Sequence, residues 1–313
     1  MPPTYQKTNI SMTNQSLTSP SGNAGLGAET VRRLAAHSPT AIYLCARNPA
    51  SADPLIADIK SSYANAKINI IPIKLDLSSL ESTKAAAESI LSQTSRLDIL
   101  YNNAGIAMTA PSLTKDGYET QFGVNYIGHT MFTQLLLPLM LQTAATAPPK
   151  SVRIVNVSSA AHGRSVPNGI ALDEVRTDMA SRHTAIRYGH SKVANILFAQ
   201  KLAQLYPSVT SVSLHPGFVA TEINTGKGGG SAWLSWIVRN AVRWVGLTVE
   251  DGTKTQLWCG VAPEVENGKY YEPIGVMKAG SKWVQDEAKR EELWQWTEKE
   301  LKAHGGPGWP ETK

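Results

Sequence analysis

The chain has 313 residues, of which 42% are hydrophobic and 18% are charged, with a formal net charge of +5. This composition is ordinary for a globular protein with a sizeable core, and the length fits one large α/β domain or two smaller ones. No run of Lys and Arg is interleaved with aromatic residues, so a nucleic-acid partner is not expected. The mildly basic balance suits anionic ligands such as a phosphorylated cofactor.

The cysteine count and the N-terminal residues both favour a cytoplasmic protein. Cys45 and Cys259 have no metal-type spacing and provide no disulfide framework, which points to a reducing compartment and to no metal site. Residues 1–16 are polar, without the apolar segment of a signal peptide, and we expect them to be a disordered tail. No uninterrupted apolar run is long enough to cross a bilayer.

A glycine cluster precedes the first expected helix. Residues 16–27 read SLTSPSGNAGLG, and a helical pattern follows over residues 28–37. Glycines allow the backbone to approach a ligand closely, and a helix N-terminus presents free N–H groups and a positive dipole end. The arrangement is typical of a loop that holds a dinucleotide pyrophosphate.

Apolar, β-rich runs then alternate with helical patterns. A Ser-x-x-Glu capping box at Ser78 and Glu81 predicts a helix through residue 92, and a long helix carrying Asn125 is expected over about 117–141. Strands are expected over residues 40–46, 68–73, 97–101, 152–157, 210–214 and 268–271. The alternation predicts an α/β fold with a doubly wound parallel sheet and helices on both faces. Because no linker or repeat divides the sequence, we expect one domain over residues 17–313.

Tyr188 and Lys192 lie four residues apart in an expected helix over residues 187–200. Residues at this spacing share a helix face, so the phenol and the ammonium point the same way. A fixed cation beside a phenol stabilises the phenolate and lowers its pKa, which allows the tyrosine to act as a general acid or base. The same spacing is also common on ordinary surface helices.

A series of motifs in a fixed order resembles the short-chain dehydrogenase/reductase family, close to its retinol-dehydrogenase-like and fungal secondary-metabolism branches. The motifs are GNAGLG, ARN, LDL, NNAG, FGVNYIGH, VNVSS, YGHSK and HPGFVAT. Each is a weak match, but together they are specific, and the resemblance extends from about residue 17 to residue 305. It implies a single Rossmann-type domain that transfers a hydride between a nicotinamide cofactor and an alcohol or carbonyl group.

The resemblance implies a set of catalytic residues. Tyr188 would be the general acid or base, and Lys192 would lower its pKa and bind the nicotinamide ribose. Ser159, with Ser158 as the competing assignment, would hydrogen-bond the substrate carbonyl. Asn125 would support a proton relay through water, although a polar residue that satisfies helix backbone is an alternative interpretation.

The resemblance also implies a cofactor, NADP. An acid at the end of the second strand would bind the ribose 2′-hydroxyl of NAD, but the residue there is Arg47, which suits the 2′-phosphate of NADP. Asp76 matches the acid that reads adenine. The other residues assigned to the cofactor are Gly22, Gly25, Leu26, Gly27, Asn103, Ala104, Gly105, Tyr188, Lys192, Pro216, Gly217, Val219 and Thr221.

The first strand departs from the family pattern. Residues 13–19 are polar, whereas a central parallel strand is usually rich in Val, Ile and Leu. Pro20 and Ser21 stand where the family has Thr and Gly. Three alternatives stay open: the strand tolerates polar residues, the correct start of the sequence is missing, or cofactor affinity is reduced.

Two further segments bear on the substrate. Residues 222–248 are expected to form a lid, and the apolar stripe of residues 231–247 implies a hydrophobic small-molecule substrate or, alternatively, contact with a membrane surface. Residues 160–187 are expected to be a solvated loop, although they contain His162, Asp173, Glu174 and His183. The later tryptophans, Trp283, Trp294, Trp296 and Trp309, are expected in the core or in a homodimer contact.

The sequence therefore predicts an NADP-dependent oxidoreductase that interconverts an alcohol and a ketone or aldehyde on a hydrophobic molecule, with secondary metabolism as a plausible setting. A catalytically weak dinucleotide-binding scaffold and an NAD-preferring dehydrogenase are the alternatives.

Overall fold

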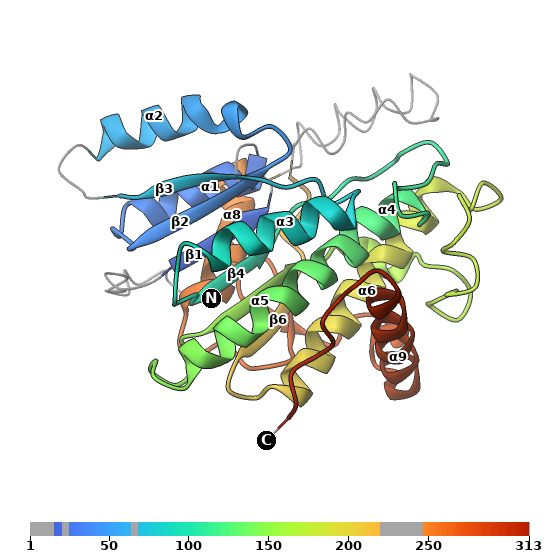
Figure 1. Cartoon of the computed structure of the whole chain (residues 1–313). Coiled ribbons are helices and arrows are strands. Elements are labelled where there is room, and N and C mark those ends of the chain that lie inside the picture. Colours follow the sequence, from blue (N-terminus) through green and yellow to red (C-terminus); the bar gives the residue numbers. More distant parts are fainter. Residues whose placement is uncertain (1–15, 21–24, 64–67, 220–246, 313) are drawn as a thin grey trace.

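The computed structural model describes residues 16–20, 25–63, 68–219 and 247–312. Their strands form one sheet in the order β3-β2-β1-β4-β5-β6-β7-β8, as Figure 1 shows in part. Neighbouring strands are parallel except for β7 and β8, which are antiparallel. The strands are β1 Ser16–Pro20, β2 Ala41–Ala46, β3 Ile70–Lys74, β4 Ile99–Asn102, β5 Arg153–Val157, β6 Thr210–Leu214, β7 Tyr270–Glu272 and β8 Val276–Lys278. The predicted parallel sheet is confirmed, and the edge strand β8 is an addition to it.

Helices cover both faces of this sheet (Figure 1), which confirms the doubly wound α/β fold. One face carries α1 Gly25–Ala35, α2 Asp53–Ser62 and α8 Val249–Val261, and the other carries α3 Leu80–Leu91, α5 Gly128–Ala144 and α6 Thr184–Leu205. A further helix, α9 Glu287–Ala303, packs against α6. The short helical turns are η1 Pro49–Ala52, α4 Thr120–Phe122, η2 Gly123–Ile127, η3 Ala160–Gly163 and η5 Lys282–Val284.

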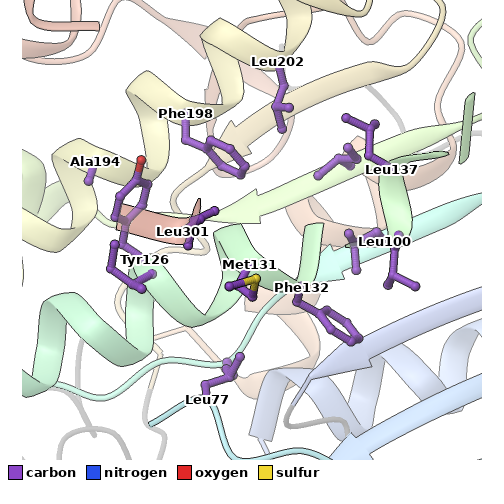
Figure 2. Close-up of a cluster of buried hydrophobic side chains, with 14 of the residues drawn as sticks. Leu77, Leu100, Tyr126, Met131, Phe132, Leu137, Ala194, Phe198, Leu202 and Leu301 are labelled. Atoms are coloured by element: carbon purple, nitrogen blue, oxygen red, sulfur yellow. The ribbon is translucent and has the colours of Figure 1, made fainter. Parts of the chain in front are cut away.

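Alternate residues of the strands belong to two separate hydrophobic cores. In β2, Ile42 lies in the core beneath α1, α2 and α8, whereas Tyr43 lies in the core beneath α3, α5 and α6. Figure 2 shows the second core, into which Met131 of α5, Phe198 of α6 and Leu301 of α9 project. Strand β2 is buried at every position because helices cover both of its faces.

The polar strand β1 forms at the centre of the sheet despite its composition. It pairs with β2 from Ser16 opposite Ala41 to Pro20 opposite Cys45, and it also pairs with β4. Ladder hydrogen bonds join backbone groups, so neighbouring strands can hold a strand whose own side chains are polar. This favours the first of the three alternatives. Residues 1–15 of the expected tail lie outside the described residues, and Ser16 already belongs to the strand.

One prediction of local helix structure is wrong, and another is confirmed with a change of helix type inside it. The N-cap of α3 is Ser79, whose Oγ accepts from the Ser82 N–H at 3.3 Å, whereas Ser78 donates its hydroxyl to Asp76 at 2.7 Å. Both serines precede the helix, but the extended backbone of Ser79 directs its side chain at the free N–H groups. The expected long helix is confirmed as a continuous helical run over residues 120–144, made of α4, the π-helical turn η2 and α5, and Asn125 lies in the π-helical turn.

Most of residues 160–187 form turns and loop segments, as expected, but several of their side chains are buried rather than solvated. His162 is only 5% exposed, so that prediction is wrong for this side chain. Glu174 forms an ion pair with Arg182, and the His183 ring accepts from the Ala185 N–H as the N-cap of α6. Asp173 is exposed, as expected.

The C-terminal tryptophans extend the core over α6. Trp294 is buried and stacks on Trp309, with 4.4 Å between ring centroids, and both rings lie near Phe198 of α6. Trp283 and Trp296 are partly buried against the same core. The expectation that these residues are core is confirmed, and the homodimer contact stays a prediction.

A buried ion pair holds the beginning of α6. Arg187 donates to the Glu119 carboxylate at 2.7 Å and to the Thr109 carbonyl at 2.8 Å, and the two charged side chains are 1% and 0% exposed. Loss of one partner would leave the other buried without compensation, a cost of about 3–5 kcal/mol. The pair therefore fixes the helix directly beside Tyr188.

Two residues after Arg187, α6 and η3 approach each other through Gly189. A Cβ at Gly189 would collide with the carbonyl oxygens of Ala161 and Arg164. The backbone of η3 can therefore lie against α6 only because this position lacks a side chain.

We expect Gly189→Ala to lower the free energy of unfolding by about 1–3 kcal/mol, because the added methyl group must push η3 away from the helix. Gly163→Ala is the matched control, since a Cβ there meets nothing within 4 Å, and it should change stability by less than about 0.5 kcal/mol. Denaturant unfolding of both variants tests this. Equal stability changes would contradict the close approach.

Candidate active site

The residues singled out from the sequence lie along one edge of the sheet. Arg47 follows β2, Asp76 follows β3, Ser159 follows β5 and Gly217 follows β6. This is the carboxyl edge of the parallel strands, and the strand order reverses between β1 and β4. Ligands of open α/β sheets bind in the crevice outside this edge, at the point of reversal.

Tyr188, Ser159 and Lys192 converge at this edge. The Ser159 hydroxyl lies close enough to the Tyr188 phenol to lower its pKa through hydrogen bonding. Lys192 Nζ lies 5.5 Å from the centre of the Tyr188 ring and donates to the Val157 carbonyl at 2.9 Å. The structure thus brings Ser159, which is distant in the sequence, close to Tyr188 and Lys192, which lie one helical turn apart.

The electrostatics of the pair differ from the expectation. Burial raises the pKa of Tyr188, and the hydrogen bond to Ser159 offsets part of this rise. Burial also lowers the pKa of Lys192 to about 7. Lys192 therefore loses its proton before Tyr188 does, and no fixed cation remains at the pH where the phenol titrates. The expected lowering of the phenol pKa is wrong for this structure, and Tyr188 is a neutral phenol at physiological pH.

The two serines after β5 have different surroundings. Ser158 is 2% exposed and donates its hydroxyl to the Lys192 carbonyl at 2.8 Å, so its side chain is committed to α6. Ser159 is partly exposed, and its Oγ accepts from the Ala161 N–H at 3.2 Å. Ser159, rather than Ser158, is therefore the serine whose hydroxyl reaches Tyr188.

Asn125 links the segment after β4 to α6. Its side-chain oxygen accepts from the Ile106 N–H at 2.8 Å, and its amide nitrogen donates to the Ile106 carbonyl at 2.9 Å and to the Ser191 hydroxyl at 3.0 Å. A Cβ on Gly105 would lie 3.4 Å from the Asn125 oxygen and 3.5 Å from Lys192 Nζ. Asn125 thus does not satisfy its own helix, and its part in a proton relay stays a prediction.

Opposite charges gather at the ends of β2 and β3. Lys115 Nζ lies 3.7 Å from the Asp76 carboxylate, and Arg47 is close enough to act on the same group. Burial by itself would raise the pKa of Asp76, but hydrogen bonds from the Ser78 hydroxyl and N–H, together with the two cations, hold it below its ordinary value. The carboxylate can accept hydrogen bonds while the cations face an anion.

The remaining assigned residues lie on the loops around this edge. Gly25, at the start of α1, and Gly217 have positive φ angles of 52° and 92°. The Ala104 carbonyl accepts from His129 Nε2 at 2.8 Å. The other assigned residues that the structure describes on these loops are Leu26, Gly27, Asn103, Gly105, Pro216 and Val219. Gly22, Thr221 and nearly all of the expected lid and membrane segment, over residues 222–248 and 231–247, lie outside the described residues.

Sequence reasoning missed three residues that hold the site together. Gly189 permits the approach of η3, Ser191 binds Asn125, and His129 binds the loop after β4. Gly189 and Ser191 stand inside the YGHSK motif, and His129 follows Asn125 at helical spacing. The sequence therefore places all three residues close to the predicted site residues. Their partners come from other elements, which no local pattern reveals.

Two classes of feature are missing from the part of the chain that the structure describes. No group of three or more His, Cys, Asp or Glu residues could hold a metal ion there. None of the helices in those ranges is long and apolar enough to cross a membrane.

Known proteins resemble this chain along most of its length. A family model for short chain dehydrogenases matches residues 21–171. A short-chain dehydrogenase/reductase of Armillaria gallica is 38% identical over 90% of this chain and 88% of its own length. Retinol dehydrogenase 12 of Mus musculus is 32% identical, covering 92% and 86%.

The fold also resembles that of a solved structure. The structure of NADPH-bound carbonyl reductase from chicken fatty liver has a TM-score of 0.62 at 23% identity, covering 86% of this chain and 95% of that one. Identity at the level of the Armillaria and mouse proteins, over nearly the whole chain, shows common descent. The chain therefore belongs to the short-chain dehydrogenase/reductase family and is an oxidoreductase of its retinol-dehydrogenase-like, fungal branch.

Proposed function

We propose that the protein uses NADP to interconvert an alcohol and a ketone or aldehyde on a hydrophobic small molecule. The observation that carries this proposal is the convergence of the Tyr188 phenol, the Ser159 hydroxyl and the Lys192 amino group at the carboxyl edge of the sheet. A dinucleotide bound at this edge would supply the hydride.

The residues present fit such a cofactor. Asp76 offers a carboxylate for the adenine amino group, and Arg47 and Lys115 offer cations for a 2′-phosphate. Gly105 leaves space beside Lys192 Nζ, where ribose hydroxyl groups would bind. The helix α1 begins at Gly25 and directs its free N–H groups at a pyrophosphate.

Side chains of this protein donate and accept the proton that accompanies hydride transfer. Ser159 donates a hydrogen bond to the carbonyl oxygen, and Tyr188 gives that oxygen its proton in reduction or removes it in oxidation. The raised pKa of Tyr188 keeps the phenol protonated, which is the form that carbonyl reduction requires.

A hydrophobic substrate is supported by exposed apolar side chains on the segments that follow the strands. Met108, after β4, is 37% exposed and Phe218, after β6, is 71% exposed. The printed names of the mouse retinol dehydrogenase and the chicken carbonyl reductase also fit carbonyl and alcohol chemistry. A tailoring step in secondary metabolism is part of this proposal and rests on the resemblance of the sequence motifs alone. A cytoplasmic location, a homodimer and membrane-surface contact stay predictions from the sequence.

Tyr188→Phe should lower turnover by about 10²- to 10⁴-fold, because the proton donor is lost while the ring and the cofactor site remain. The measurement is NADPH oxidation with 4-nitrobenzaldehyde and a panel of lipophilic ketones, beside NADPH binding by fluorescence quenching, which should change little. Tyr206→Phe is the control, since it removes a buried phenol hydroxyl that donates to the Pro310 carbonyl, far from the site. Full turnover in Tyr188→Phe would refute the assigned role. Absence of saturable NADPH binding to the parent protein would instead rule against an NADP-dependent enzyme.

Arg47→Asp should weaken NADPH binding by about tenfold to a hundredfold and change NADH binding much less, because a carboxylate would face the 2′-phosphate. Lys299→Asp, on the exposed face of α9, makes the same change in net charge away from the site and should leave both affinities unchanged. Titration of each cofactor into the three proteins tests this. Equal losses for the two cofactors in Arg47→Asp would contradict the assignment of Arg47 to the 2′-phosphate of NADP.

A further inference from the structure

The proposed chemistry leaves out His162, a buried histidine directly beneath Ser159. Its backbone N–H and its Nδ1 both reach the Ser159 carbonyl, at 3.0 and 2.7 Å. Its Nε2 is 2.9 Å from the Ser281 backbone nitrogen, which belongs to the segment after β8. One imidazole therefore spans the catalytic strand end and a turn about 120 residues away in the sequence.

The two partners permit a single protonation state of the ring. The Ser159 carbonyl can only accept, so Nδ1 must carry the hydrogen, and the Ser281 N–H can only donate, so Nε2 must be bare. His162 is therefore a neutral Nδ1–H tautomer with both nitrogens satisfied. Burial agrees with this state, because it lowers the pKa of His162.

The surroundings leave the ring little freedom to move. The Tyr270 ring packs edge-on against it with 5.0 Å between centroids, and a Cβ on Gly280 would lie 3.4 Å from Nε2. Glu272 and the buried His215 are the titratable groups that act on it electrostatically. The ring is thus held from three elements: η3, β7 and the turn before η5.

The contacts of His162 affect the orientation of the Ser159 hydroxyl. The Ser159 Oγ and the Ser159 carbonyl belong to the same extended residue, and the carbonyl receives two hydrogen bonds from His162. A fixed carbonyl sets the backbone dihedral angles from which the hydroxyl projects toward Tyr188. A displacement of about 1 Å at a reacting group can cost on the order of 10²-fold in rate.

We propose that His162 is a positioning residue: as the Nδ1–H tautomer it fixes Ser159 against Tyr188 through its hydrogen bond to the Ser159 carbonyl. This inference rests on the proposed function for its effect on turnover, and on the described contacts for its effect on the Ser159–Tyr188 hydrogen bond.

Two substitutions at His162 test the contributions of its two ring nitrogens separately. His162→Asn places an amide N–H where Nδ1 stands and so keeps the bond to the Ser159 carbonyl, but loses the acceptor for Ser281. His162→Gln places an amide oxygen where Nε2 stands and keeps the bond to Ser281, but loses the donor to Ser159. Ser281→Ala is the control, because it keeps the backbone N–H and removes only a hydroxyl 3.5 Å from the His162 carbonyl.

We expect His162→Gln to lower kcat for 4-nitrobenzaldehyde about tenfold to a hundredfold with the KM for NADPH unchanged, whereas His162→Asn keeps kcat within about twofold. A merely structural role would instead reduce kcat in both variants in step with their loss of thermal stability, and that result would overturn the proposal.

A second measurement does not depend on turnover. In the ¹⁵N-labelled protein without added ligand, the His162 nitrogens should show the Nδ1–H tautomer, and the ¹³Cζ resonance of Tyr188 should shift in His162→Gln but not in His162→Asn. An Nε2–H tautomer, or an unchanged Tyr188 resonance in His162→Gln, would overturn the proposal. If the parent protein reduces none of the carbonyls tested but these resonances behave as expected, the proposed function fails and the positioning of Ser159 by His162 stands.

Discussion

The site depends on the close contact between the backbone of η3 and the helix α6 at Gly189. Any side chain at this position would meet the carbonyl oxygens of Ala161 and Arg164. Because the contact exists, the end of β5 lies against the helix that carries Tyr188, and the Ser159 hydroxyl reaches the phenol. A glycine inside a catalytic motif thus acts through the space it leaves rather than through any chemistry of its own.

Burial then decides the charges of the groups that this contact brings together. The same desolvation raises the pKa of Tyr188 and lowers that of Lys192, because in both cases it penalises the charged form. The phenol is therefore protonated before any ligand arrives, and the lysine titrates near neutral pH.

Contacts between segments that are distant in the sequence stabilise the elements of the site. Arg187 and Glu119 fix the start of α6 through a buried ion pair, and Trp294 and Trp309 cover the same helix farther along. His162 connects Ser159 to the turn at Ser281. These contacts thus support α6 and the end of β5, the elements that carry Tyr188 and Ser159.

The sequence by itself determined the features that arise from local periodicity. The alternation of apolar runs and helical patterns predicts the parallel sheet, and the spacing of Tyr188 and Lys192 places both on one helix face, because strand and helix repeats are set by backbone geometry. Only the tertiary structure decided which neighbouring groups meet. The tertiary structure places Ser79 rather than Ser78 at the N-cap of α3, and it pairs the polar strand β1 with apolar neighbours. It also buries His162 and lowers the pKa of Lys192. Each of these depends on partners or on burial supplied by distant segments, and no local pattern encodes them.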